Sequence, residues 1–169
     1  MTISKLLIIG YGNPGRGDDA LGPELVELIE KENHPEVECQ NDMQLQVEYV
    51  TDLENRELTL FVDADASCEA PFHFSQIKAE KDDSYTSHAM SPHAVLHAYQ
   101  QVFGIQAPPA FLLRIRGYQF ELGESLSENA SANLDAARTF TKTLCATPNI
   151  RQWSSLLNAS SMNNVNSDS

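Results

Sequence analysis

The chain has 169 residues and carries 24 acidic against 11 basic side chains, which gives a formal net charge of −13. This length suits a single domain, and a hydrophobic content of 41% is enough to build a core. The negative charge disfavours binding to nucleic acid or to anionic lipid, because either partner requires a positive protein surface. We therefore expect no nucleic-acid or membrane partner, whereas cationic ligands and metal ions are compatible with the composition.

Cysteine usage and the first residues bear on the cellular compartment. The widely spaced Cys39, Cys68 and Cys145 form neither a disulfide framework nor a Cys-x-x-Cys metal motif. The apolar run before Gly10 is too short for a signal-peptide core or a membrane span. We expect free thiols and a cytoplasmic protein, present as a monomer.

The first predicted elements are a strand, a glycine-rich loop and a helix. The strand covers residues 5–9, which are mostly apolar, and Gly10 ends it. The loop extends to Asp19, which we predict as the N-cap of a helix ending near residue 31. Pro23 then lies in the first turn, where its missing N–H breaks no helical hydrogen bond. One apolar stripe of this helix is formed by Leu21, Leu25, Leu28 and Ile29.

Four further strands are predicted downstream. Alternation of apolar and polar residues indicates a strand over 45–49, and apolar runs indicate strands over 58–62 and 110–116. Residues 72–77 are a weaker candidate. Because helix-length segments separate the strands, we expect an α/β fold, a three-layer αβα sandwich with a twisted, mostly parallel sheet of about five strands.

Two later helices have recognisable starting residues. Ser91 as N-cap and Pro92 at the first helical position predict a helix that ends near residue 103. Ser125 and Glu128 form a possible capping box for the last helix. The domain is expected to cover 1–148, followed by a polar and mobile tail over 149–169. Within that tail the apolar Trp153, Leu156 and Leu157 are able to dock one turn on the domain.

The glycine-rich loop contains the Gly-x-Gly-x-x-Gly pattern of dinucleotide-binding proteins, at Gly10, Gly12 and Gly15. That chemistry requires free backbone N–H groups at the helix start, facing the phosphates. Here Pro14 removes one N–H group, and the acidic Asp18 and Asp19 precede the helix. Nucleotide binding is therefore a disfavoured alternative.

Acidic and histidine side chains are the candidates for chemistry. Asp63 follows an apolar strand, the position at which α/β sheets bind ligands, although a surface turn explains it equally well. Asp18 and Asp19 also have a structural explanation, because carboxylates stabilise a helix N-terminus. His93 and His97 are spaced for metal binding on one helix face, but no His-Glu-x-x-His motif is present.

Three motifs taken together resemble the hydrogenase maturation proteases, endopeptidases that complete the large subunit of nickel–iron hydrogenases. The sequence from Ile9 to Pro23 is similar to that family's Gly-x-Gly-Asn loop with an acidic pair and a glycine. Val62-Asp63-Ala64 and Ser91-Pro92-His93 match two shorter family motifs in the same order. The resemblance covers residues 5–145 and implies an αβα sandwich.

The resemblance also implies a metal-binding trio of Asp19, Asp63 and His93. We predict that one of its carboxylates, Asp19 or Asp63, is catalytic and activates water as a general base. Metal-bound water is the alternative nucleophile. The implied metal is nickel, presented by the precursor of a nickel–iron hydrogenase large subunit, from which the protease removes a C-terminal extension. Asp18, Asp65, His88 and His97 match no ligand position of the family. A non-catalytic nickel-binding or chaperone-like module is the alternative function.

Overall fold

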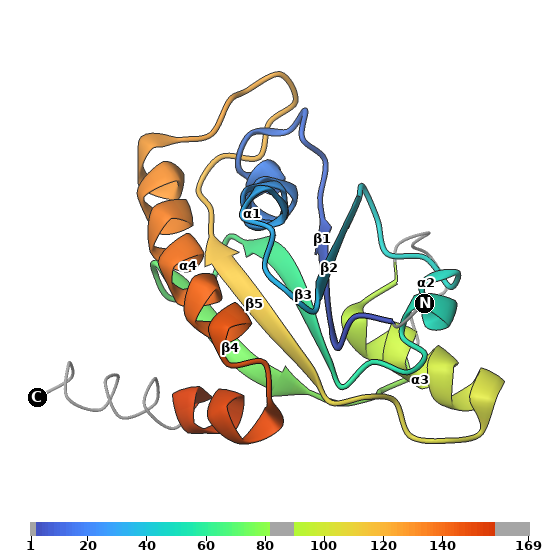
Figure 1. Cartoon of the computed structure of the whole chain (residues 1–169). Helices are drawn as coiled ribbons and strands as arrows, with labels where there is room; N and C mark the ends of the chain where they lie inside the picture. The colour runs from blue at the N-terminus through green and yellow to red at the C-terminus, as the bar shows by residue number, and fades with distance from the viewer. Residues whose placement is uncertain (1–2, 82–89, 158–169) are drawn as a thin grey trace, which may run out of the picture.

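Figure 1 shows the computed structural model of the chain, which describes residues 3–81 and 90–157. A five-stranded sheet with the strand order β2-β1-β3-β5-β4 forms its centre. The strands are β1 (Leu6–Tyr11), β2 (Val37–Asp42), β3 (Leu58–Asp65), β4 (Phe72–Ile77) and β5 (Ala110–Arg116). The helices are the 3₁₀ turn η1 (Gly17–Ala20), α1 (Leu21–Lys31), α2 (Tyr49–Asp52), α3 (Pro92–Phe103) and α4 (Glu128–Ala146).

Strand pairing is parallel except at one edge of the sheet. β1 pairs in parallel with β2 and β3, and β3 pairs in parallel with β5. β4 runs antiparallel to β5. This arrangement confirms the prediction of a mostly parallel sheet of five strands.

Helices cover both faces of the sheet, as the alternation of buried side chains along the strands requires. Leu6 and Ile8 of β1 pack in a core with α1 and α4. Leu7 and Ile9 point to the opposite face, where α2 and α3 pack. In Figure 1 α1 and α4 lie on one side of the sheet and α2 and α3 on the other. The three-layer αβα architecture is therefore confirmed.

The second strand differs from its prediction. Residues 45–48 are irregular and end in a turn that leads into α2, which begins at Tyr49, and the apolar side chains of Leu45 and Tyr49 are buried. The second strand along the chain is instead β2, which ends at Asp42. Its polar sequence and half-buried side chains suit the edge of a sheet. Period-two alternation over so few residues does not distinguish a strand from a turn followed by a short helix.

Of the three predicted helix starts, the structure confirms that of α3 and differs from those of α1 and α4. α3 begins as predicted, with the Ser91 hydroxyl accepting a hydrogen bond from the Ala94 N–H. Asp19 is not the N-cap of α1, because Asp19 lies within η1, the 3₁₀ turn that precedes this helix. For α4 the N-cap is Ser127 rather than Ser125, since the Ser127 hydroxyl accepts from the Ala130 N–H.

The described part of the predicted tail packs against the core. Residues 150–157 are helical, and the Trp153 side chain is completely buried. Its indole N–H donates to the Leu144 carbonyl at 3.1 Å, and its ring lies edge-on to Phe111, with 5.0 Å between centroids. The core therefore extends beyond the expected boundary at residue 148. Residues 150–157 dock on the domain through the buried Trp153 side chain. Residues 158–169 of that tail lie outside the described part of the chain.

We expect Trp153→Ala to lower the free energy of unfolding by about 3–5 kcal/mol, because it leaves a cavity and an unpaired carbonyl in the core. Denaturant titration measures this change. The nearby exposed Arg151 provides the control, and Arg151→Ala should change stability by less than about 0.5 kcal/mol. Equal stability of the two variants would show that the segment adds nothing to the core.

Across residues 3–81 and 90–157, no helix combines the length and the apolar character needed to cross a membrane.

Candidate functional site

The carboxyl ends of β1 and β3 form the candidate site. The chain leaves β1 to form β2 on one side and β3 on the other, so the order of the strands reverses between β1 and β3. Open α/β sheets bind ligands beyond the carboxyl ends of the strands at such a reversal point. Asp19 follows β1 within η1, and Asp63 lies near the end of β3. The topology therefore brings these two predicted residues to one edge of the sheet.

Glycines allow the loop after β1 to lie directly against the strand ends. Gly12 has a φ of +150°, and a Cβ atom there would lie 2.1 Å from the Asp19 carbonyl oxygen. A Cβ atom on Gly22 would lie 2.5 Å from the Val62 carbonyl oxygen. Only glycine fits such close approaches of backbone to backbone. Gly12 of the pattern that resembles a dinucleotide motif thus lets η1 lie against the loop after β1, and Gly22, outside that pattern, lets α1 lie against β3.

The orientation of Asp19 is fixed by the loop that carries it. The Asn13 backbone N–H donates to Asp19 Oδ2 at 2.7 Å. Asn13 is itself held in a turn, because its side-chain oxygen accepts from the Gly15 N–H and its carbonyl accepts from the Arg16 N–H. The loop therefore fixes the Asp19 carboxylate through Oδ2, and Oδ1 has no hydrogen bond from residues 3–81 and 90–157.

Asp63 is a partly buried carboxyl group with an unusual proton affinity. Burial raises its pKa to about 7, opposed by hydrogen bonds from the Ala64 N–H and the Tyr11 hydroxyl. The negative charges of Asp19 and Asp65 raise the pKa further. The Ala64 N–H donates to Asp63 Oδ1 at 2.8 Å. A carboxyl group that titrates near neutral pH is suited to accept or release a proton.

Polar side chains extend from Asp63 in a row across the whole sheet. Tyr11 is aligned with Asp42 of β2, and Arg114 is aligned with both Asp63 and His73 of β4. Each of these five alternates along its strand with residues that face α1 and α4, so all five point to the face covered by α2 and α3. Burial and the charges of Asp63 and Asp19 raise the pKa of Tyr11, which keeps its hydroxyl protonated.

Sequence reasoning missed Tyr11 and Arg114. Tyr11 occupies the variable position between Gly10 and Gly12, Arg114 belongs to no motif, and the alignment of both depends on the register of the strands. The Arg114 guanidinium donates to Asp65 Oδ2 at 2.9 Å. Asp65 also accepts hydrogen bonds from the Ser67 N–H and hydroxyl, at 2.7 and 2.8 Å. Asp65 therefore has a full set of partners and is not part of the open site.

Asp18 has a structural role beside the site. It is completely buried and accepts hydrogen bonds from the backbone N–H groups of Tyr118, Gln119 and Ser127, and from the Ser127 hydroxyl. Further backbone hydrogen bonds join residues 15–18 to residues 119–124. The loops after β1 and β5 consequently lie side by side at the carboxyl edge (Figure 1).

The structure does not bring His93 to the two acids. Its Nδ1 donates to the Lys78 carbonyl at 2.9 Å, and Lys78 directly follows Ile77, which is aligned with Ala110 at the start of β5. Asp63 is aligned with Arg114, four residues further along β5. The Lys78 carbonyl that binds His93 is therefore at least about 13 Å from the level of Asp63 along the strand direction. Across residues 3–81 and 90–157, no three His, Cys, Asp or Glu side chains are grouped to hold a metal ion. The predicted trio is thus present as a pair of acids, with His93 separate.

The remaining histidines and the cysteines considered in the sequence do not join the two acids. His88 lies outside the described residues, and His97 lies within α3. Cys39, Cys68 and Cys145 are free thiols, as expected. Burial raises the pKa of both Cys39 and Cys145 to about 12, which keeps these two thiols protonated and unreactive.

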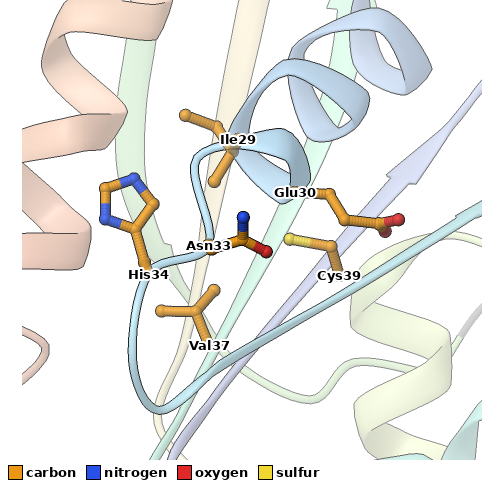
Figure 2. Close-up of a pocket in the computed structure, with 6 residues that line it drawn as sticks. All are labelled: Ile29, Glu30, Asn33, His34, Val37 and Cys39. Atoms are coloured by element: carbon orange, nitrogen blue, oxygen red, sulfur yellow. The ribbon is translucent and has the colours of Figure 1, made fainter.

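A cavity of about 240 Å³ lies at the opposite edge of the sheet, between the end of α1 and the start of β2 (Figure 2). Its walls include Glu30, His34 and Cys39. His34 and Cys39 lie on opposite sides in this view, and the His34 Nε2 is paired with Glu32 at 2.7 Å. These groups therefore do not converge on a ligand. Two hollows that adjoin the site loops, of about 420 and 280 Å³, share Pro14 as a wall.

Comparisons with known proteins agree with the arrangement described above. No protein-family model and no curated protein sequence matches this chain. Several solved structures match over most of its length. The nickel–iron hydrogenase maturation protease HycI from Thermococcus kodakarensis KOD1 matches with a TM-score of 0.68 at 20% identity, over 85% of this chain and 94% of that one.

Two more matches come from other organisms. The hydrogenase maturating endopeptidase HybD from Escherichia coli has a TM-score of 0.63 at 23% identity, covering 83% of this chain and 91% of its own. The hydrogenase 2 maturation peptidase from Thaumarchaeota archaeon SCGC_AB-539-E09 has a TM-score of 0.59 at 23% identity, covering 81% and 95%. The chain therefore has the fold of the solved hydrogenase maturation proteases.

Proposed function

We propose that this protein is an endopeptidase that removes a C-terminal extension from the precursor of a nickel–iron hydrogenase large subunit. The observation that carries the proposal is the position of Asp19 and Asp63. Two residues predicted from motifs 44 positions apart lie at the reversal point of a sheet whose fold is that of the solved maturation proteases. The fold by itself does not define an activity, but the paired carboxylates supply groups for peptide hydrolysis.

The proposed substrate brings its own nickel, which serves as the recognition element. Carboxylate oxygens and an imidazole nitrogen form a donor set that suits Ni²⁺. Asp19 and Asp63 would hold the metal, and one of them would accept the proton of the attacking water. Asp63 is the candidate for the latter role, because it lies at the end of β3 and burial raises its pKa to about 7 in the metal-free protein.

His93 is the proposed third ligand, and its hydrogen bonding supports that role in one respect. A carbonyl oxygen only accepts hydrogen bonds, so the contact with Lys78 requires the proton to reside on Nδ1. In a neutral imidazole with the proton on Nδ1 the lone pair is on Nε2, the form in which imidazoles bind metals while the other nitrogen donates to a carbonyl. The proposal requires the start of α3 to approach Asp63 when substrate binds.

Incubation of the purified protein with nickel-loaded and nickel-free precursor tests this function, with intact mass spectrometry as the measurement. We expect loss of the extension from the nickel-loaded precursor alone. His93→Gln should slow that cleavage, whereas His97→Gln, one helical turn away, serves as the matched control. Unchanged cleavage by His93→Gln would remove this residue from the site. Nickel binding without any loss of mass would favour the non-catalytic module.

A further inference from the structure

Arg114 lies beside the proposed catalytic acids without having been assigned a role. It is aligned with Asp63 on the neighbouring strand, and both side chains point to the α2/α3 face of the sheet. Adjacent strands are about 4.8 Å apart, so the Arg114 stem passes next to the Asp63 carboxyl group. Its guanidinium reaches Asp65, two residues further toward the carboxyl edge, at 2.9 Å. The positive charge is therefore held at the edge where substrate would enter.

The hydrogen-bonding capacity of Arg114 is not exhausted by this ion pair. Nη1 donates to Asp65, but Nε is buried and has no hydrogen-bond partner among the described residues. Buried donors in native proteins nearly always have a partner, and one without it marks a place for water or ligand. The side chain as a whole is 35% exposed, so a ligand can reach it.

Arg116 provides a contrast on the same strand and the same face. Its Nη1 donates to the Cys68 carbonyl at 2.8 Å, and its Nε donates to the Gly117 carbonyl at 3.3 Å. The guanidinium also lies over the Tyr118 ring, 5.0 Å from the centroid. Arg116 therefore holds the backbone together, whereas Arg114 keeps donors for another molecule.

We propose that Arg114 is a substrate-binding residue that holds the carbonyl oxygen of the scissile peptide bond, an inference that rests on the proposed peptidase function. A carbonyl oxygen fits this position better than a substrate carboxylate. Asp19, Asp63 and Asp65 would repel a full negative charge on the free substrate, but they tolerate a neutral carbonyl group.

The benefit of this contact arises during hydrolysis. Water adds to the carbonyl carbon while one of its protons passes to a carboxylate of the site. The electron pair of the carbonyl π bond moves to oxygen, which becomes negative and binds the guanidinium more strongly. The carbon–nitrogen bond then breaks, the electron pair returns to re-form the carbonyl, and the departing nitrogen takes the proton. A donor that binds more strongly in the transition state raises kcat rather than lowering KM.

Steady-state cleavage of the nickel-loaded precursor tests the role with Arg114→Gln, Arg114→Lys and the matched charge loss Arg116→Gln. We expect Arg114→Gln to lower kcat by about 100-fold with little change in KM. Arg114→Lys should recover part of the loss through its charge. Arg116→Gln should keep the wild-type kcat, although it will be less stable to heat.

The double variant Asp65→Asn/Arg114→Gln separates substrate binding from a purely structural ion pair. If Arg114 only neutralises Asp65, removing both charges restores cleavage and the inference is wrong. If Arg114 binds substrate, the double variant stays as slow as Arg114→Gln. Should Arg114→Gln not fold, the kcat of Arg114→Lys decides, because a wild-type value contradicts the inference. Absence of cleavage by the wild-type protein overturns the proposed function and this inference with it. A wild-type rate in Arg114→Gln overturns the inference alone.

Discussion

Asp63→Asn is expected to slow precursor cleavage strongly and at the same time to make the protein more stable above pH 7. Asparagine keeps the shape of the side chain and an oxygen for the Ala64 N–H. It accepts no proton at neutral pH, so loss of a general base should lower the rate by about 10²–10⁴-fold. Cleavage assayed by mass spectrometry measures this effect.

The stability change follows from the pKa of about 7 that burial gives Asp63, against an ordinary value of 3.8. Between about pH 4 and pH 7 the native state binds more protons than the unfolded state. The free energy of unfolding therefore falls as pH rises across this interval and levels off above pH 7. Because asparagine is neutral in both states, the variant should be more stable than wild type by about 2–4 kcal/mol at pH 8.

Urea titrations of both proteins at several pH values measure this difference. The expected advantage of Asp63→Asn shrinks toward pH 4, where Asp63 is protonated in both states of the wild type. Asp135, exposed on α4, supplies the control, since Asp135→Asn should follow the wild-type curve. Parallel curves for wild type and Asp63→Asn would contradict the burial assigned to this carboxyl group.

Asp18→Ala is expected to destabilise the protein by about 3–5 kcal/mol, because it leaves buried N–H groups without an acceptor. The Asp18 carboxylate accepts at 2.7, 3.0 and 2.8 Å from the N–H groups of Tyr118, Gln119 and Ser127. Asp18→Asn should be nearly as severe, since an amide group offers one oxygen acceptor in place of two. Denaturant titration against Asp135→Asn provides the measurement and its control.

The contribution of Asp18 also depends on pH. Burial raises its pKa, but the hydrogen bonds to Ser127, Gln119 and Tyr118 outweigh burial and leave the pKa below its ordinary value of 3.8. The stabilisation is therefore complete above about pH 4 and is lost as pH falls through the native pKa. An Asp18→Ala variant as stable as wild type at pH 7 would show that the two loops are held by other contacts.

The sequence predicted those helices and strands whose formation depends on residues close together in the chain. β4 and β5 have the predicted bounds, and α3 starts at the predicted Ser91-Pro92 pair. These predictions depend on short apolar runs or on caps, which act within a few residues. The strand expected at 45–49 was wrong, and β2 was missed, because an edge strand with polar side chains has no apolar pattern of its own.

Helix capping shows where local reasoning was insufficient. Ser125 and Ser127 are both able to cap a helix, and the structure selects Ser127, which also donates its hydroxyl hydrogen bond to Asp18, 109 positions earlier in the chain. No local pattern contains that contact. The same limit explains why the two adjacent acids were hard to separate, since Asp18 is enclosed by the loop after β5 whereas Asp19 faces the site.

The motifs pointed to Asp19 and Asp63, and the topology places both at one edge of the sheet. His93 is a different case, because its motif predicted the helix start but not its position relative to the acids. Tyr11 and Arg114 were inaccessible from sequence, since their alignment with Asp63 depends on the register of three strands. The chain's −13 charge is compatible with a cationic ligand but does not locate a site, whereas the motifs and the topology point to two of the acidic side chains.

Hydrolysis of the nickel-loaded precursor in ¹⁸O-labelled water is the most direct test of the central claim, that Asp19 and Asp63 form a peptidase site. Mass spectrometry of the shortened subunit identifies both the cut and the source of the new carboxyl oxygen. We expect the wild-type protein, and not Asp63→Asn, to yield a large subunit that lacks its extension and carries ¹⁸O in the new C-terminal carboxylate. A precursor of unchanged mass after incubation with the wild-type protein, or equal cleavage by both proteins, would contradict the claim.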